Sequence, residues 1–464
     1  MPTFYRRRPP AAAVFWLLML AAMMPVSGRS QTPAVYLTME EAIHRALAEN
    51  TQIQSSRYAY QEALWSRRQA WTQLFPEVSF STRYTWIDDS TLALRDFTRY
   101  LPFDVPQTVF QETYATSFDV TMPIFNGVLL NGLRIAAKNK EMAGHLNTSA
   151  RQQTVYDVIT AYLNLMHARS INNVQVQYLQ LSQMNLNKAR RMHEAGRYSQ
   201  MEVLRWQVDY QQQKSALTNS ETGMRQAAAE LARVLNMDMH RQIVTEDSIP
   251  AALTTESDQI HQAPDNKIRK MIDLSHDQLV QANAALAAAD ARQEMSKMQH
   301  RNSYASFMPN VSLSYNYAWR ENNTIELDDY SPKTFMIHFN VPVFKSFRNV
   351  TEAKATYYAY KKQKADFAGQ LQNTRLTLTQ TVNQIINLKD QLQLAATNVQ
   401  YNEHNYRIVA RQKEKGLASN IEFIDAKLNL QDAKLTQLKN RYDFISGIVR
   451  LYYLTGRLDK LIDY

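Results

Sequence analysis

Two stretches of alternating apolar and polar residues decide the fold: FPEVSFSTRYTW at 75–86 and MPNVSLSYNYAW at 308–319. In the first stretch, Phe80 and Tyr84 fall on one side of an extended chain, while Arg83 falls on the other. Successive side chains of a strand point to opposite faces. Each stretch therefore predicts a strand with one apolar, aromatic face and one polar face.

Two further stretches, around 114–121 and 335–341, alternate in the same way, which gives four predicted strands of about 8 to 11 residues. Strands of this length with one aromatic face are typical of membrane-spanning barrels. The alternative is a soluble sheet with one buried face. That sheet needs a covering layer, and the rest of the chain is committed to long helices.

The two halves of the chain repeat each other. Val78 corresponds to Val311, at an offset of 311 − 78 = 233, and Gly196 corresponds to Gly416, at an offset of 416 − 196 = 220. The offset shrinks because the first inter-strand loop is longer than the second. Each unit is predicted to contain a helix, two strands, a very long helix, a tight turn and another long helix.

The repeat sets the predicted domain boundaries. We expect a signal peptide at 1–30, a first structural repeat at 31–236, a linker at 237–270, a second structural repeat at 271–456 and a C-terminal tail at 457–464. The signal peptide follows from three arginines before an apolar run that is too short for a spanning helix.

The helices are expected to be unusually long and laterally paired. The segment from Gly127 to Ala195 contains no proline, which allows one helix of about 100 Å. Apolar heptads recur along the chain, and one series is Leu371, Leu378, Ile385, Leu392, Val399 and Tyr406. Sustained heptads predict coiled-coil packing. By themselves they fit both a projecting helical barrel and a solid bundle.

Composition narrows the class further. The formal net charge is +9, and the basic residues are scattered through helical stretches, which we interpret as solvated faces rather than a nucleic-acid surface. The chain has no cysteine, so it carries no disulfide and no lipidated cysteine. We find no catalytic motif and expect neither an enzyme nor a cofactor.

Four strands cannot close a barrel in lipid, because the smallest such barrels use eight strands and lipid tolerates no unpaired edge. The sequence therefore predicts an oligomer in which each chain contributes two hairpins.

Several motifs together resemble the TolC-type outer membrane efflux proteins. The resemblance runs from about 37 to 457, and it rests on LTMEEAIHRALAEN, LFPEVSFS, FMPNVSLS, MPIFNG, VPVFKS, AGRYSQMEVLRWQ and KGLASNIEFIDAKLNL. It implies a homotrimer with a twelve-strand β-barrel in the outer membrane and a twelve-helix coiled-coil barrel in the periplasm. The linker and the tail would form a belt around that helical barrel.

The resemblance also implies a function. The protein would be the exit duct of a tripartite efflux pump, and its partners would be a periplasmic adaptor, an inner-membrane transporter and outer membrane lipid. A duct for type I protein secretion is one alternative. A soluble periplasmic coiled-coil scaffold is another.

By resemblance, the two helical turns form the periplasmic tip where the adaptor docks. The implied docking residues are Gly196, Arg197, Tyr198, Ser199, Gly416, Leu417, Ala418 and Ser419. Each serine is placed to cap the helix that follows.

The family's aperture acids fall on Glu422 and Asp425, which share a helix face and would form charged rings in a trimer. The latch arginine and tyrosine of some members fall on Ala418 and Lys413, which departs from that pattern. In the first repeat Glu202 and Arg205 occupy the matching places. A pair between Arg205 and either acid is the expected substitute, and ordinary solvated turn charges are the alternative.

Overall fold

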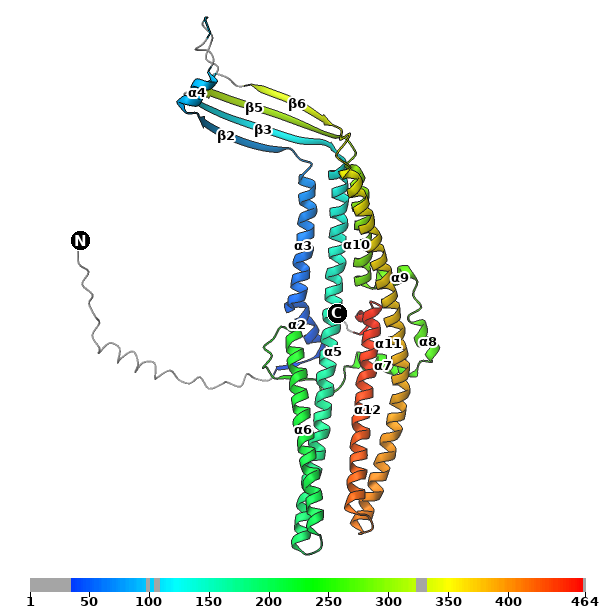
Figure 1. Cartoon of the computed structure of the whole chain (residues 1–464). Helices are drawn as coiled ribbons and strands as arrows, with labels where there is room; N and C mark the ends of the chain where they lie inside the picture. Colours follow the sequence, from blue (N-terminus) through cyan, green and yellow to red (C-terminus); the bar gives the residue numbers. More distant parts are fainter. Residues whose placement is uncertain (1–34, 97–100, 104–108, 323–331, 462–464) are drawn as a thin grey trace, which may run out of the picture.

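The computed structural model describes residues 35–96, 101–103, 109–322 and 332–461. The expected signal peptide at 1–30 lies outside these residues, as does the end of the expected tail, 462–464. The molecule is elongated, with a strand layer at one end and two helical hairpins at the other (Figure 1).

The strand layer is a four-stranded antiparallel sheet in the order β2-β3-β5-β6. Its strands are β2 (Glu77–Trp86), β3 (Glu112–Asn126), β5 (Asn310–Asn322) and β6 (Lys333–Asn340). The predicted alternation holds. Phe80 pairs with Phe118 and Ser81 pairs with Ser117, so apolar residues lie beside apolar residues and polar residues beside polar residues on neighbouring strands. The first inter-strand segment also contains a short helix, α4 (Asp89–Arg95).

Strand β3 contains a proline, Pro123, and continues beyond it to Asn126. Its pairing with β5 is irregular between Pro123 and Phe125. The partner β2 begins only at Glu77, opposite Thr121, so Pro123 lies where β3 has a neighbour on one side only. A missing N–H is tolerated at such a position.

Each strand is joined at its lower end to a long helix, which precedes β2 and β5 and follows β3 and β6. These helices form a second layer below the sheet. The helices are α3 (Thr51–Thr72), α5 (Gly127–Glu194), α10 (Ala284–Ala305) and α11 (Arg348–Glu414). Packing runs from α3 to α5, from α5 to α10 and from α10 to α11, which reproduces the strand order (Figure 1). The predicted long helices are confirmed, since α5 has 68 residues and α11 has 67.

Away from the sheet, α5 pairs with α6 (Gln200–Val234), and α11 pairs with α12 (Asn420–Leu454). The heptad positions Leu378, Ile385 and Val399 are buried, as coiled-coil packing requires. None of the helices in the described part of the chain is long and apolar enough to cross a membrane.

The waist of the molecule contains the main hydrophobic core and several short elements. They are β1 (Val35–Leu37), α2 (Met39–Glu49), β4 (Ile243–Thr245), α7 (Ala251–Gln262), α8 (Asp265–Lys270), α9 (His276–Ala282) and the 3-10 helix η2 (Leu458–Leu461). Strands β1 and β4 pair in parallel, and this joins the start of the chain to the expected linker. Tyr162 and Leu451 are fully buried in the core here, where both hairpins leave the waist.

Candidate functional site

The two hairpin turns have the same backbone design. Gly196 has a φ of 71° and Gly416 a φ of 76°, a region that L-residues with a side chain avoid. The N–H of Arg197 donates to the carbonyl of Met192 at 2.8 Å, which closes the Schellman motif of a helix end. The N–H of Leu417 makes the equivalent bond in the second turn, also at 2.8 Å. These glycines therefore fix where each long helix stops.

Both serines cap the helices that follow, as expected. Ser199 forms a capping box with Glu202, and Ser419 forms one with Glu422. The Glu422 carboxylate accepts the Ser419 N–H at 2.7 Å, and this backbone hydrogen bond lowers the pKa of Glu422. Glu422 is therefore a structural cap, and it also remains exposed at the end of α12.

An aromatic cluster joins the two hairpins just above the turns. Trp206 of α6 is buried against Phe423 of α12, with ring centroids 6.1 Å apart. Tyr406 of α11 lies 5.4 Å from the Phe423 ring. Leu186, Ala189 and Val203 complete the buried part of this small core. The tip therefore has its own hydrophobic contact, separate from the core at the waist.

A polar bridge lies beside this cluster and includes two expected site residues. The Asn420 amide donates to the Glu202 carboxylate at 2.7 Å, and its oxygen accepts from Lys413. The Lys413 ammonium also lies 4.8 Å from the centroid of Trp206, a cation–π contact. The pKa of Lys413 is lowered to about 8, mainly by burial and also by nearby Lys188, while Glu202 opposes the shift.

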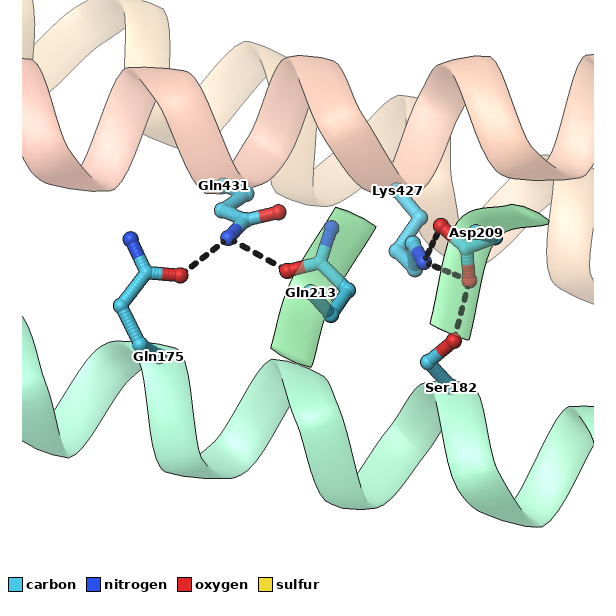
Figure 2. Close-up of polar contacts among 6 residues, drawn as sticks. All are labelled: Gln175, Ser182, Asp209, Gln213, Lys427 and Gln431. Carbon is cyan, nitrogen blue, oxygen red and sulfur yellow. Dashed lines mark hydrogen bonds and ion pairs between the residues drawn. The ribbon is translucent and has the colours of Figure 1, made fainter. Parts of the chain in front are cut away.

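Further from the tip, the hairpins meet through a buried polar seam (Figure 2). Lys427 of α12 donates to both carboxylate oxygens of Asp209 of α6 at 2.6 Å, and Ser182 of α5 donates to the same carboxylate. Lys427 and Asp209 are both almost completely buried. Burial lowers the pKa of Lys427, and its contact with Asp209 acts in the opposite direction.

One turn above, a second buried layer continues the seam. The Gln431 amide donates to Gln213 at 2.9 Å and to Gln175 at 2.8 Å (Figure 2). The bridges from α6 to α12 at Glu202, Asp209 and Gln213 each join residues 218 positions apart. Helices α6 and α12 therefore run in the same direction in one register, with polar side chains in the positions that face each other.

The expected latch is not formed within the chain. Among the described residues, Arg205 makes no ion pair with Glu422 or Asp425, although Arg205 and Asp425 line the same groove of about 360 Å³ between α6 and α12. The bridge at Asn420 and the pair of Asp209 with Lys427 were not anticipated. Polar residues at spacings of seven and four on both helices were the signal that could have indicated them.

This combination defines a class of elongated protein. An antiparallel sheet passes strand by strand into long helices, and these end in paired hairpin tips. Residues 42–237 and 276–457 match the family described as "Outer membrane efflux protein", and the chain belongs to this family. The resemblance and the outer-membrane localisation expected from the sequence are thereby confirmed.

Two curated relatives from Pseudomonas putida have the same degree of similarity. They are the antibiotic efflux pump outer membrane protein ArpC and the toluene efflux pump outer membrane protein TtgC. Each is 24% identical to this chain over 313 residues, which is 65% of the chain and 60% of the relative. The match thus spans about three fifths of the length of these relatives.

Solved structures share the fold at low sequence identity. The CmeC outer membrane channel of Campylobacter jejuni superposes with a TM-score of 0.77 at 11% identity, covering 90% of this chain and 86% of that one. The outer membrane protein VceC of Vibrio cholerae superposes with a TM-score of 0.75 at 15% identity, covering 90% and 96%. These likenesses support the helix-dominated fold.

Proposed function

We propose that the protein is the outer membrane exit duct of a tripartite efflux pump and that it works as a homotrimer. The family supports the efflux role, and the relatives ArpC and TtgC carry efflux pumps in their names. In this proposal a periplasmic adaptor and an inner-membrane transporter deliver the cargo. Small molecules then leave through a barrel continuous with the helices.

The observation that carries the proposal is the open sheet. Within the described residues, β2 pairs only with β3, and β6 pairs only with β5, so both outer edges lack a partner strand. The apolar face of the sheet is also exposed, and Phe80 and Phe339 are 61% and 68% accessible. Open edges do not suit a lone chain in lipid, and an exposed apolar face does not suit a lone chain in water. Three copies supply twelve strands, which is enough to close a barrel.

The aperture is assigned to the tip of the helical hairpins. In a trimer, Asp425 and Glu422 would form rings of negative charge that attract cations. Lys413 and Glu202 would act within each protomer, since Asn420 links them between the hairpins. Opening would separate α6 from α12, which breaks this bridge and the pair of Asp209 with Lys427. Arg205 remains a candidate partner for the aperture acids of a neighbouring protomer.

The two turns are the proposed docking site for the adaptor, comprising residues 196–199 and 416–419. Leu417 is 76% accessible and Met201, one turn into α6, is 59% accessible. Exposed apolar residues at a helical tip fit a partner that presents its own helical hairpin.

The domain boundaries remain part of the proposal. The first and second repeats, 31–236 and 271–456, would each supply two strands and one hairpin. The linker, 237–270, and the tail, 457–464, would form the belt.

Planar-bilayer recording with the purified chain tests the function. We expect single-channel conductance and trimers that resist detergent, because the barrel closes only between protomers. The chain has no cysteine, so one introduced cysteine on β2 and one on β6, placed in a small panel of positions, report contact between protomers by disulfide formation. A monomer that stays in plain buffer and conducts nothing would support the scaffold alternative instead.

A further inference from the structure

The helices directly below the sheet carry basic side chains without acidic partners. Arg68 of α3, Arg134 of α5, Arg301 of α10 and Lys354 of α11 are exposed. In the described part of the chain, none of the four forms an ion pair, unlike nearby Lys138, which pairs with Glu141 at 2.8 Å. Each of the four lies within about 11 Å of the end of its helix that meets the sheet. We call these four residues the basic ring.

The contacts between the helices fix which face of the layer carries the ring. On α5, Gly144 and Lys140 face Tyr60 of α3, while Gly127 faces Ala305 of α10. At about 100° per residue, the Arg134 side chain leaves α5 on the side that lies between the direction of α3 and the direction of α10.

Equivalent contacts place the other ring members. Thr356 of α11 hydrogen-bonds Ser303 of α10 at 3.2 Å, which sets the direction in which these two helices face each other. At about 100° per residue, Lys354 and Arg301 lie about 160° from this contact, on the side of the layer toward which Arg134 is displaced. Arg68 lies about 80° from the direction of Tyr60, on the same side. The opposite face carries Glu62, Gly132, Glu352, Ala355 and Ala359, and also Arg348, which lies about 20° from the direction of Ala355 on α11.

The basic face lies on the same side as the apolar face of the sheet. The Ile87 N–H, just after β2, donates to the Gln111 carbonyl at 2.9 Å. In a strand every second residue directs its backbone groups to the same side, so the odd-numbered residues of β2, which carry the polar side chains, direct theirs toward β3. For L-residues this places β2 to the left of β3 when the polar face is viewed with the helices below. The right-handed turn of α5 then carries Arg134 to the far, apolar side. The ring therefore lies just beneath the exposed aromatic side chains of the strands.

We propose that the basic ring binds anionic phospholipid headgroups of the membrane leaflet that faces the periplasm. The inference rests on the proposed function, because it requires the sheet to lie in the membrane. Aromatic side chains accompany the ring: the Arg68 guanidinium lies 4.4 Å from the centroid of Trp65, and Tyr304 is 54% exposed near the top of α10. Aromatic and basic side chains together are typical of a membrane interface.

Distance from the sheet along the helices distinguishes binding to lipid headgroups from binding to a cell-wall polymer deeper in the periplasm. The same face continues downward with Arg57, Lys361 and Lys364, which lie about 20 to 24 Å from the upper helix ends. Electrostatic attraction is screened over about 8 to 10 Å at physiological salt. Headgroups would therefore engage the ring and leave these three lower residues unaffected.

Lipid selectivity can be measured with the full chain in bilayers of phosphatidylcholine and brominated phosphatidylglycerol. Bromine quenches tryptophan, and Trp65 and Trp71 of α3 lie close to the ring. The changes Trp86→Phe and Trp319→Phe remove the strand tryptophans from the signal. We expect the anionic lipid to be enriched several-fold around the wild-type protein at low salt, and the enrichment to fall in 0.5 M salt.

The variant Arg68→Gln, Arg134→Gln, Arg301→Gln, Lys354→Gln should lose this enrichment. The matched control, Arg57→Gln, Lys361→Gln, Lys364→Gln, should retain it. Replacing the three arginines of the ring by lysine should also retain it, and this conservative variant guards against a ring variant that fails to fold.

A wild-type protein that conducts but quenches equally with brominated phosphatidylcholine and brominated phosphatidylglycerol would overturn the inference and leave the proposed function intact. Failure to insert into bilayers of either composition would instead contradict the proposed function. If the lower-residue control loses binding to purified cell-wall polymer while the ring variant keeps its lipid preference, the face recognises that polymer and the lipid assignment is wrong.

Discussion

The Lys427 ammonium lies 2.6 Å from both carboxylate oxygens of Asp209. The two residues are 218 positions apart in the sequence, and their contact joins helix α12 of one hairpin to helix α6 of the other. Burying two charges is expensive, and their mutual attraction offsets the cost only while both remain in contact. Such a pair contributes little net stability but strongly disfavours any other register of α6 against α12. A polar joint of this kind also separates more readily than an apolar one, because its groups are solvated once it opens.

Removing one partner of this pair should therefore destabilise the joint more than removing both. We expect Asp209→Ala or Lys427→Met to cost about 3 to 5 kcal/mol, because each leaves a buried charge without a partner. The double variant Asp209→Leu with Lys427→Met should recover most of this loss. Helical circular dichroism during thermal unfolding measures the effect, and conductance recordings should show more frequent opening of the single variants. Additive losses in the double variant would contradict the coupling.

The sequence predicted the strands and long helices well because their signals are local. Alternation in 75–86 and 308–319, the absence of proline through α5 and glycine at 196 each depend on neighbouring residues only. The polar seam could not be predicted in the same way. Asp209 and Lys427 acquire their significance from the register of two helices that are far apart in sequence. The basic ring was missed for a similar reason, since four separate helices contribute to it.

The tip should become more stable as the pH rises above 8. Burial lowers the pKa of Lys413 to about 8 in the folded state, whereas an unfolded lysine titrates near 10.5. Below pH 8 both states hold the proton. Between about pH 8 and 10 the unfolded state binds more protons, so the free energy of unfolding increases with pH.

The comparison with Lys413→Met isolates this effect. Thermal unfolding of the wild type from pH 7.5 to 9.5 should show a midpoint that rises relative to the variant. The upper limit avoids the tyrosines near the tip, such as Tyr198, whose pKa burial raises. A constant difference between the two proteins across this range would show that Lys413 keeps an ordinary pKa.

The turn glycines should resist substitution. Gly196→Ala places a side chain at a φ of 71°, which costs about 1 to 2 kcal/mol and loosens the end of α5. Gly416→Ala should behave in the same way. Gly223→Ala is the control, because it lies within α6 with no neighbour within 4 Å of the added carbon, and alanine favours a helix by up to about 1 kcal/mol. The unfolding midpoint and crosslinking to the adaptor measure both effects. Equal losses in all three variants would show that the left-handed backbone is unimportant.

The charge of the tip should set the ion selectivity of the pore. Asp425→Asn with Glu422→Gln removes two carboxylates per protomer but keeps the cap of α12, since glutamine also completes a capping box. In a trimer this removes six negative charges from the narrowest part of the proposed aperture. The cation-to-anion permeability ratio should therefore fall several-fold, and the reversal potential in a salt gradient should move toward zero.

Asp277→Asn on α9 provides a matched control, because it removes an exposed carboxylate at the waist and should leave the reversal potential unchanged. The difference between the two variants should shrink at high salt, because screening shortens the range over which the charges of Asp425 and Glu422 act. If neutralising Asp425 and Glu422 changes selectivity no more than neutralising Asp277, the acids are solvated turn charges and the aperture lies elsewhere along the helices.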